Sequence, residues 1–149
     1  MKTLHFSILI NAPKEKVWKL MLEHEGYKAW TAEFAAGSDY QGSWEKGEKM
    51  TFFSAGHGGM TSVIAENIPY EFVSIKHLGF VKDGFEDTES PEVKAWAPAF
   101  ENYRFSENDG VTEVKADMEV IPECEDFMAQ IWPKALAKLK MICEEPTHG

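Results

Sequence analysis

Residues 124–142, CEDFMAQIWPKALAKLKMI, form the stretch that decides the fold. Apolar side chains recur there at the i, i+3, i+4, i+7 spacing of a helix that lies on a hydrophobic core. They are Cys124, Phe127, Met128, Ile131, Ala135, Leu139 and Ile142, flanked by Trp132 and Leu136. A face this wide requires a large partner, and a curved sheet would serve. Pro133, inside the pattern, predicts either a kink or the start of a second helical section.

Six segments upstream of this helix have the pattern of β-strands. They cover residues 4–10, 49–54, 60–67, 70–78, 99–106 and 111–121. In the last segment, apolar residues from Val114 to Val120 alternate with charged ones, which is typical of an antiparallel strand with one wet face. Asp109-Gly110 predicts a hairpin between the last two strands. Glycines on either side of Trp44 and at positions 56–59 predict further turns.

Two short helices are expected after the first strand. Pro13 suits the first position of a helix, and Glu15 favours the positive end of the helix dipole. The first helix has an apolar face at helical spacing, made of Val17, Leu20, Met21 and His24. Gly26 is its expected end. The second helix carries Tyr27, Trp30 and Phe34. This order of elements predicts an α+β fold.

Residues 79–98, named the acidic segment below, hold five carboxylates against two lysines, together with Phe80, Phe85 and Trp96. Connections longer than about 12–15 residues are commonly lids or binding elements, and otherwise mobile. Both interpretations stay open for this segment.

Length and charge exclude several classes of protein. The 149 residues fit one domain, which is expected to cover residues 1–149. A formal charge of −10 argues against binding to nucleic acid or to anionic membranes, because both attract clustered Lys and Arg. No secretory signal is visible, and no apolar run approaches the roughly 18 residues that span a bilayer. Cys124 and Cys143 would lie roughly 30 Å apart along a helix, so free thiols and a cytoplasmic location are expected.

Five short motifs extend over nearly the whole chain. They are Ile10-Asn11-Ala12-Pro13 with Val17-Trp18, the pair Tyr27 and Trp30, Gly42-Ser43-Trp44-Glu45-Lys46-Gly47, Asp109-Gly110-Val111-Thr112, and Trp132 with Leu136 and Leu139. In this order they resemble the helix-grip superfamily (START/Bet v 1-like, SRPBCC), most closely its branch of Hsp90 ATPase activator homologues. The resemblance implies a curved antiparallel sheet of about six to seven strands around a long C-terminal helix. Ile131 departs from the family pattern, which has glycine before the closing tryptophan, and the acidic segment exceeds a simple connection.

The resemblance also implies an apolar cavity between the sheet and the long helix. Candidate lining residues are Trp30, Phe34, Phe52, Ile75, His77, Tyr103, Phe127 and Ile131. His77 falls in phase with Val73 and Ile75, so it is either a hydrogen-bonded residue at the end of a strand or a polar anchor inside the pocket. The aromatic members either pack a plain core or line the cavity. Tyr103 brings a hydroxyl that requires a partner when it is buried.

Motifs for several catalytic chemistries are absent from the sequence. Gly56-His57-Gly58-Gly59 lacks the lysine and the strand-to-helix context of a phosphate loop. The five histidines show no HExxH spacing, and no serine stands in a G-x-S-x-G elbow. No metal or cofactor is therefore expected, and no catalytic residue is assigned.

Three functions stay open, and binding of a hydrophobic or aromatic small molecule, such as a lipid, polyketide or flavonoid-like compound, is the first. The resemblance implies a second, interaction with an Hsp90-type chaperone, although this chain carries the equivalent of only one domain of such a co-chaperone. The third is a polyketide cyclase or aromatase, with His77 and Tyr103 as the candidates for general acid–base catalysis. We expect a monomeric binding protein rather than an enzyme, and no nucleic acid or membrane partner.

Overall fold

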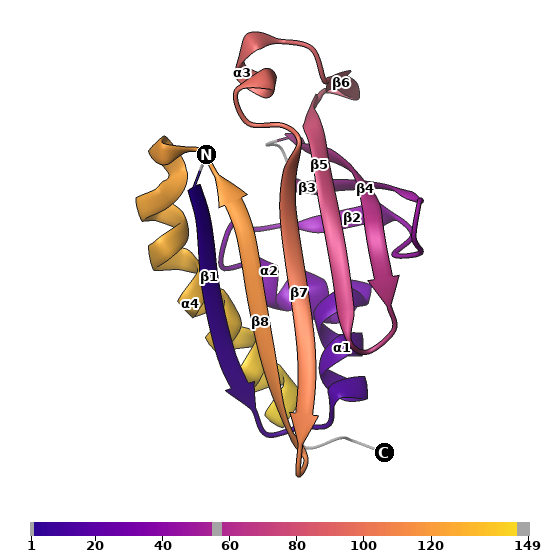
Figure 1. Ribbon diagram of the computed structural model, residues 1–149, viewed down its shortest axis with the longest axis vertical. Coiled ribbons are helices and arrows are strands. Elements are labelled where there is room, and N and C mark those ends of the chain that lie inside the picture. The colour runs from indigo at the N-terminus through magenta and orange to yellow at the C-terminus, as the bar shows by residue number, and fades with distance from the viewer. Residues whose placement is uncertain (1, 55–57, 146–149) are drawn as a thin grey trace.

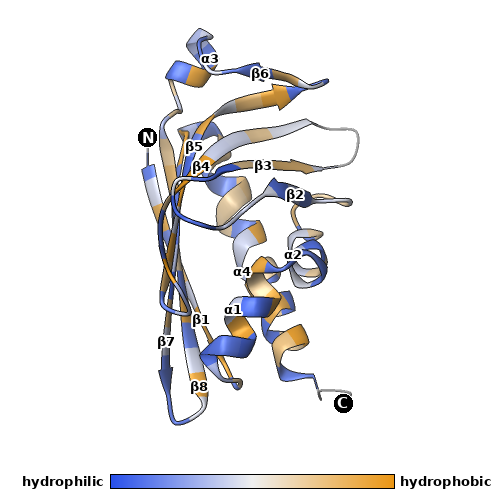
Figure 2. Cartoon of the chain, turned by 90° about the vertical axis from the view of Figure 1, so that its right-hand side faces the viewer, coloured by the Kyte–Doolittle hydropathy of each residue, from blue (hydrophilic) through white to orange (hydrophobic). Residues whose placement is uncertain are grey.

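The computed structural model describes residues 2–54 and 58–145 of the chain. The strands are β1 (Lys2–Ile10), β2 (Asp39–Gly42), β3 (Lys49–Ser54), β4 (Gly58–Ile68), β5 (Phe72–Lys82), β6 (Phe85–Asp87), β7 (Ala99–Asn108) and β8 (Val111–Val120). The helices are α1 (Lys14–Leu22), α2 (His24–Thr31), α3 (Pro91–Lys94) and α4 (Pro122–Glu144). The strands form one antiparallel sheet (Figure 1). Figure 2 shows α1, α2 and α4 together on one side of that sheet.

The strand order confirms the predicted α+β helix-grip fold. It runs β1-β8-β7-β5-β4-β3-β2, and β6 pairs with the end of β5. The sheet has eight strands instead of the expected six to seven, because residues 39–42 pair with β3 and residues 85–87 pair with β5. The pairing of β4 with β5 shifts register after Thr61 and after Ile64, and such bulges bend a strand. The turn expected at residues 56–59 lies partly outside the described residues.

The predicted long helix is α4, and Pro133 lies inside it, so no second helical section begins there. Its buried residues are Trp132, Ala135, Leu136, Leu139 and Cys143. The predicted stripe is therefore rotated, since Phe127 is 54% exposed and Trp132 only 3%. Consecutive helical residues point about 100° apart, so placing Trp132 instead of Ile131 at the centre turns Phe127 outward. Cys124 and Cys143 are free thiols, as expected.

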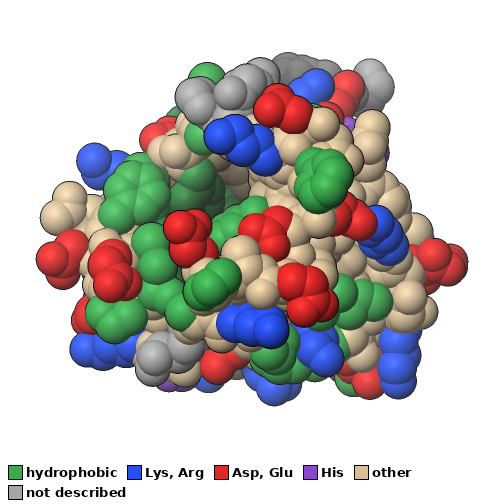
Figure 3. Space-filling model, turned by 90° about the horizontal axis from the view of Figure 1, so that it is seen from above, with side chains coloured by type: hydrophobic (Ala, Val, Ile, Leu, Met, Phe, Trp, Pro, Cys, Tyr) green, Lys and Arg blue, Asp and Glu red, His purple; other side chains and the backbone are tan. Residues whose placement is uncertain are grey.

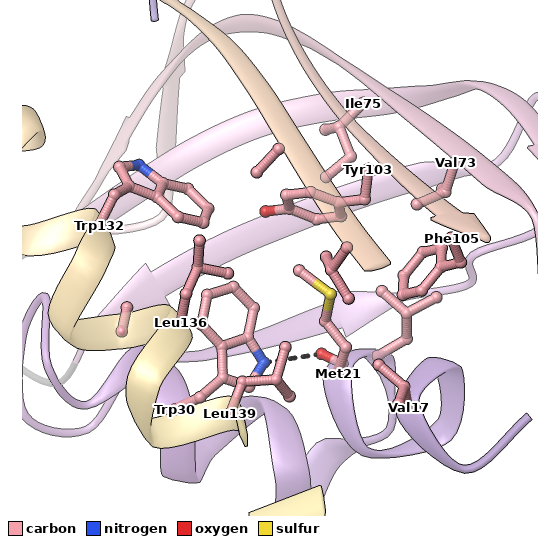
Figure 4. Close-up of a cluster of buried hydrophobic side chains, with 14 of the residues drawn as sticks. Val17, Met21, Trp30, Val73, Ile75, Tyr103, Phe105, Trp132, Leu136 and Leu139 are labelled. Atoms are coloured by element: carbon pink, nitrogen blue, oxygen red, sulfur yellow. Dashed lines mark hydrogen bonds between the residues drawn. The ribbon is translucent and has the colours of Figure 1, made fainter. Parts of the chain in front are cut away.

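Gly26 does not end the first helix, and that prediction was wrong. The first helix ends at Leu22, and Gly26 lies inside α2. A β-carbon at Gly26 would approach the backbone oxygen of Leu20 to 1.8 Å, so glycine is required for the two helices to pack at this corner. The Trp30 indole completes the corner by donating a hydrogen bond of 2.9 Å to the Met21 carbonyl (Figure 4).

The acidic segment has secondary structure of its own. Strand β5 continues to Lys82, turns through Asp83 and Gly84 at positive φ, and returns as β6. Ser90 then accepts a hydrogen bond from the Val93 amide and caps the short helix α3. Neither β6 nor α3 was predicted in this long connection, and the Asp-Gly pair at residues 83–84 supplies the hairpin turn that leads into β6.

A single core fills the space between the layers. Figure 4 shows Val17 and Met21 of α1, Tyr103 and Phe105 of β7, and Leu136 and Leu139 of α4 converging on it. Every one of these side chains is at most 4% exposed. No helix among the described residues is long and apolar enough to cross a membrane.

Candidate functional site

A cavity of about 370 Å³ lies between the sheet, α2 and the first half of α4. Its walls come from α2, the turn after it, strands β3, β4, β5, β7 and β8, the residues just before β7, and α4. The lining includes Phe100 at the start of β7 and Val120 at the end of β8, so the cavity reaches this end of the sheet. Figure 3 looks onto that end of the molecule and shows a hollow with hydrophobic side chains inside and acidic side chains beside it.

The structure brings five of the eight predicted lining residues together. Trp30, Phe34, Phe52, His77 and Tyr103 all line the cavity. The other three are not among its lining residues. Ile75 is 1% exposed and belongs to the core below, whereas Phe127 and Ile131 are turned aside by the rotation of α4.

Several lining residues were missed by the sequence reasoning. They include Tyr27, Trp96, Glu101, Met118, Cys124 and Met128. Glu101 lies on the same face of β7 as Ala99 and Tyr103, and both of those residues are buried. A charged residue in phase with buried ones was the available signal, because alternate residues of a strand share a face.

A buried polar cluster forms one wall of the cavity. The Ser62 hydroxyl oxygen lies 2.7 Å from Nδ1 of His77, and Nε2 of His77 lies 3.0 Å from Oε1 of Glu101. The Tyr103 hydroxyl donates to Oε2 of the same carboxylate. His77 is 4% exposed, so this cluster fixes its ring within the wall. His77 is thus both hydrogen-bonded at its strand and directed into the pocket.

Two tyrosines of the wall stay protonated well into the alkaline range. Burial raises the pKa of Tyr103 well above its usual value, and the nearby Glu101 carboxylate raises it further. The pKa of Tyr27 is raised in the same direction, first by burial and then by Glu101. The Tyr27 hydroxyl makes no hydrogen bond to another described residue, so this neutral group is available to a ligand.

A column of rings connects the acidic segment to the cavity. The Phe80 and Trp96 rings stack with centroids 4.8 Å apart, and Trp96 stacks on His77 at 5.8 Å. All three side chains line the cavity. The acidic segment therefore contributes part of the wall.

The polar cluster lacks the arrangement required for nucleophilic catalysis. Ser62 is 1% exposed and is not among the lining residues, so its hydroxyl does not face the cavity. Catalysis by a serine–histidine pair requires the nucleophile within reach of the substrate. In residues 2–54 and 58–145, no three His, Cys, Asp or Glu side chains are grouped closely enough to hold a metal ion.

A curved antiparallel sheet around a long helix, with an apolar cavity between them, defines a protein of the helix-grip class. The chain belongs to the family of activator of Hsp90 ATPase homolog 1-like proteins, whose sequence profile matches residues 11–144. This match confirms the family resemblance. No curated protein sequence matches the chain significantly.

Solved structures with the same fold cover nearly the whole chain. Protein MLL2253 from Mesorhizobium loti is 12% identical over 95% of this chain and 96% of its own, with a TM-score of 0.74. The Aha1 dimer from Colwellia psychrerythraea is 24% identical over 97% of both chains, with a TM-score of 0.71. CalU16 from Micromonospora echinospora is 15% identical over 95% of this chain and 76% of its own, with a TM-score of 0.66. At these identities, the similarity establishes the fold alone.

Proposed function

We propose that the protein binds a hydrophobic or aromatic small molecule in the cavity between the sheet and α4. The observation that carries this proposal is a cavity of about 370 Å³ with aromatic walls and one buried polar cluster. Ligand pockets commonly enclose roughly 300–1,000 Å³, are lined mainly by apolar side chains, and use a few polar groups to orient the ligand. In this arrangement, rings such as Trp30 and Phe52 contact the apolar body of the ligand. Glu101 and Tyr27 orient its polar end.

An amide-resolved NMR titration of the delipidated protein tests the proposal. The ligands are neutral hydrophobic compounds, namely a flavonoid, a sterol and a polyketide-like naphthol, because the cavity wall is apolar and rich in aromatic rings. We expect shifts clustered at Trp30, His77, Tyr103 and the start of α4. A well-folded sample that gives no shifts with any of them would contradict the proposal.

Two neighbouring positions of α4 provide a matched pair of variants. Met128 lines the cavity, whereas Phe127 is 54% exposed and does not. The Met128→Trp substitution adds a bulky ring inside the cavity, so we expect it to weaken binding at least about tenfold, or roughly 1.4 kcal/mol. Phe127→Trp, one residue away, is expected to leave affinity unchanged. Equal affinity in both variants would show that the ligand lies elsewhere.

Interaction with an Hsp90-type chaperone is the second candidate, because the family is named after an activator of the Hsp90 ATPase. The ATPase rate of purified Hsp90, measured with and without the protein, separates the two functions. A rise in that rate would favour the chaperone role, and an unchanged rate would favour small-molecule binding.

A further inference from the structure

The described residues that line the cavity include acidic side chains but no Lys or Arg. The acidic residues are Glu101 and Glu119. The side chain of Glu119 points to the other face of β8, because its neighbours Met118 and Val120 are the buried ones, and there its carboxylate accepts a hydrogen bond of 2.8 Å from the Phe100 amide. Glu101 therefore supplies the carboxylate of the wall, and no Lys or Arg side chain among these residues opposes it.

Glu101 has capacity for a further hydrogen-bond donor. Its side chain is 19% accessible, and each oxygen already accepts one hydrogen bond, from His77 and from Tyr103. A carboxylate offers about four lone-pair sites, so roughly two remain for a ligand. An ammonium group is a suitable ligand for these sites, because it carries several donors and a positive charge.

The rest of the wall also favours a cation. Ten of the lining residues are Phe, Tyr or Trp, and Trp30, Phe52 and Trp132 are among them. Aromatic faces attract organic cations within about 6 Å of the ring centroid, and the attraction strengthens when the cation is removed from water. A carboxylate ligand would instead meet the like charge of Glu101 in a site of low dielectric constant, where repulsion is strong.

We propose that the cavity selects organic cations, namely amines whose ammonium group faces Glu101 while their apolar body lies among the aromatic rings. This selectivity rests on the proposed small-molecule function and narrows its ligand class. It places fatty acids and other anionic amphiphiles among the poor ligands.

Three probes that share one skeleton test the charge preference. They are 1-naphthylmethylamine, 1-naphthalenemethanol and 1-naphthoate, titrated at neutral pH and moderate salt by calorimetry and NMR. We expect the amine to bind about tenfold more tightly than the alcohol, and the carboxylate to bind most weakly.

A pair of substitutions tests the role of Glu101. Glu101→Gln removes the charge but keeps the size of the side chain, so the affinity for the amine should fall further than that for the alcohol, and the amine should lose its advantage. Glu113→Gln changes the net charge equally on a strand residue that does not line the cavity, and it should leave the preference intact. If Glu101→Gln fails to fold, as judged by near-UV circular dichroism, the order of affinities of the three probes for the wild-type protein still decides whether the cavity prefers a cation.

The outcomes separate this inference from the proposed function. Equal affinity for the three probes, or tightest binding of the carboxylate, would overturn the charge preference and leave the binding function standing. Binding of none of the probes would overturn both. Equal loss of amine affinity in the Glu101 and Glu113 variants would assign the preference to net charge alone and would also contradict the inference.

Discussion

Thr112 joins two segments that are 100 positions apart in the chain. Its hydroxyl is fully buried and donates a hydrogen bond of 2.7 Å to the carbonyl of Ala12. The turn before α1 is thereby tied to the start of β8. Two of the sequence motifs that predicted the fold, at residues 10–13 and 109–112, therefore meet at one contact.

Replacing Thr112 with valine should destabilise the protein. The substitution keeps the shape of the side chain but leaves the buried Ala12 carbonyl without its donor, at a cost of about 1–3 kcal/mol. Urea unfolding followed by tryptophan fluorescence measures the loss. Thr3→Val, at an exposed position of β1, is the control and should change stability by less than about 0.5 kcal/mol.

The buried thiol of Cys143 should lower the free energy of unfolding as the pH rises in the alkaline range. Burial raises its pKa from 9.0 to about 12. Above its ordinary pKa, the unfolded chain releases the proton while the folded protein retains it, so the free energy of unfolding falls as pH rises. Below that pKa, this group has no effect.

The comparison with Cys143→Ala isolates this thiol. Wild-type protein should lose about 1 kcal/mol more stability than the variant as the pH rises by one unit above the ordinary thiol pKa. Urea denaturation at closely spaced pH values gives the difference. Parallel pH profiles of the two proteins would contradict the prediction.

Single residues of the cavity could be predicted where strand alternation was informative. His77 lies in phase with buried neighbours, and its ring faces the cavity as that phase indicates. Glu101 obeys the same alternation but carries a charge, and charges ordinarily indicate a wet face. Its burial depends on the hydrogen bonds from His77 and Tyr103, which come from tertiary contacts.

At the scale of elements, helices and strands could be predicted more closely than their orientation. The pattern at residues 124–142 gave the helix, yet its inward face is centred on Trp132. The apolar face is so wide that the sequence allows several rotations of the helix about its axis, each of which buries a different set of apolar residues. Only the shape of the opposing sheet selects one of them.

The two Asp-Gly turns show how composition can hide a structural signal. Asp109-Gly110 was predicted as a hairpin, and both residues have positive φ. Asp83 and Gly84 have the same geometry, yet no hairpin was predicted there, because residues 79–98 were treated as one long connection. Local turn chemistry decided the structure at both sites.

Replacing Pro133 with alanine should stabilise α4. Proline inside a helix lacks the amide proton that would bond to the carbonyl four residues earlier, and it costs up to about 3 kcal/mol. Alanine also raises the conformational entropy of the unfolded chain, which offsets part of this effect. We therefore expect the free energy of unfolding, measured by heat and by urea, to rise by about 1–2 kcal/mol.

Pro91 provides the matched control for this prediction. It occupies the first turn of α3, where a missing amide proton costs little, so Pro91→Ala should bring no gain. A loss of stability in Pro133→Ala would show that the proline shapes α4 for its place on the sheet.

At the scale of the whole molecule, the order of motifs predicted the fold, and the family resemblance implied a cavity, whereas the size of that cavity did not follow from the sequence. Its volume is the space left after side chains from seven separate elements have packed. A change in one rotamer alters that space, and no periodicity in the sequence encodes it. Composition therefore left open whether the aromatic residues fill the core or line a pocket.

Ligand binding should stabilise the whole protein. A ligand at about 100 times its Kd stabilises the folded state by roughly 2.7 kcal/mol when it has no affinity for the unfolded chain. Differential scanning calorimetry with the naphthalene probe that binds most tightly should show the corresponding rise in Tm. Met128→Trp, whose affinity is expected to be at least about tenfold lower, should be stabilised at most about half as much under the same conditions, whereas an unspecific effect of the probe would raise both Tm values equally.

Within the described residues, strand β1 pairs only with β8, so the strand of this sheet that is synthesised first has the last strand as its partner. Contacts between such distant segments form slowly, because a long loop must close before they are made. Throughout synthesis, the apolar side of β1, with Leu4, Phe6 and Ile8, is without its neighbour. The sheet is therefore completed only after translation has passed β8, and the nascent chain is open to chaperones and to aggregation until then.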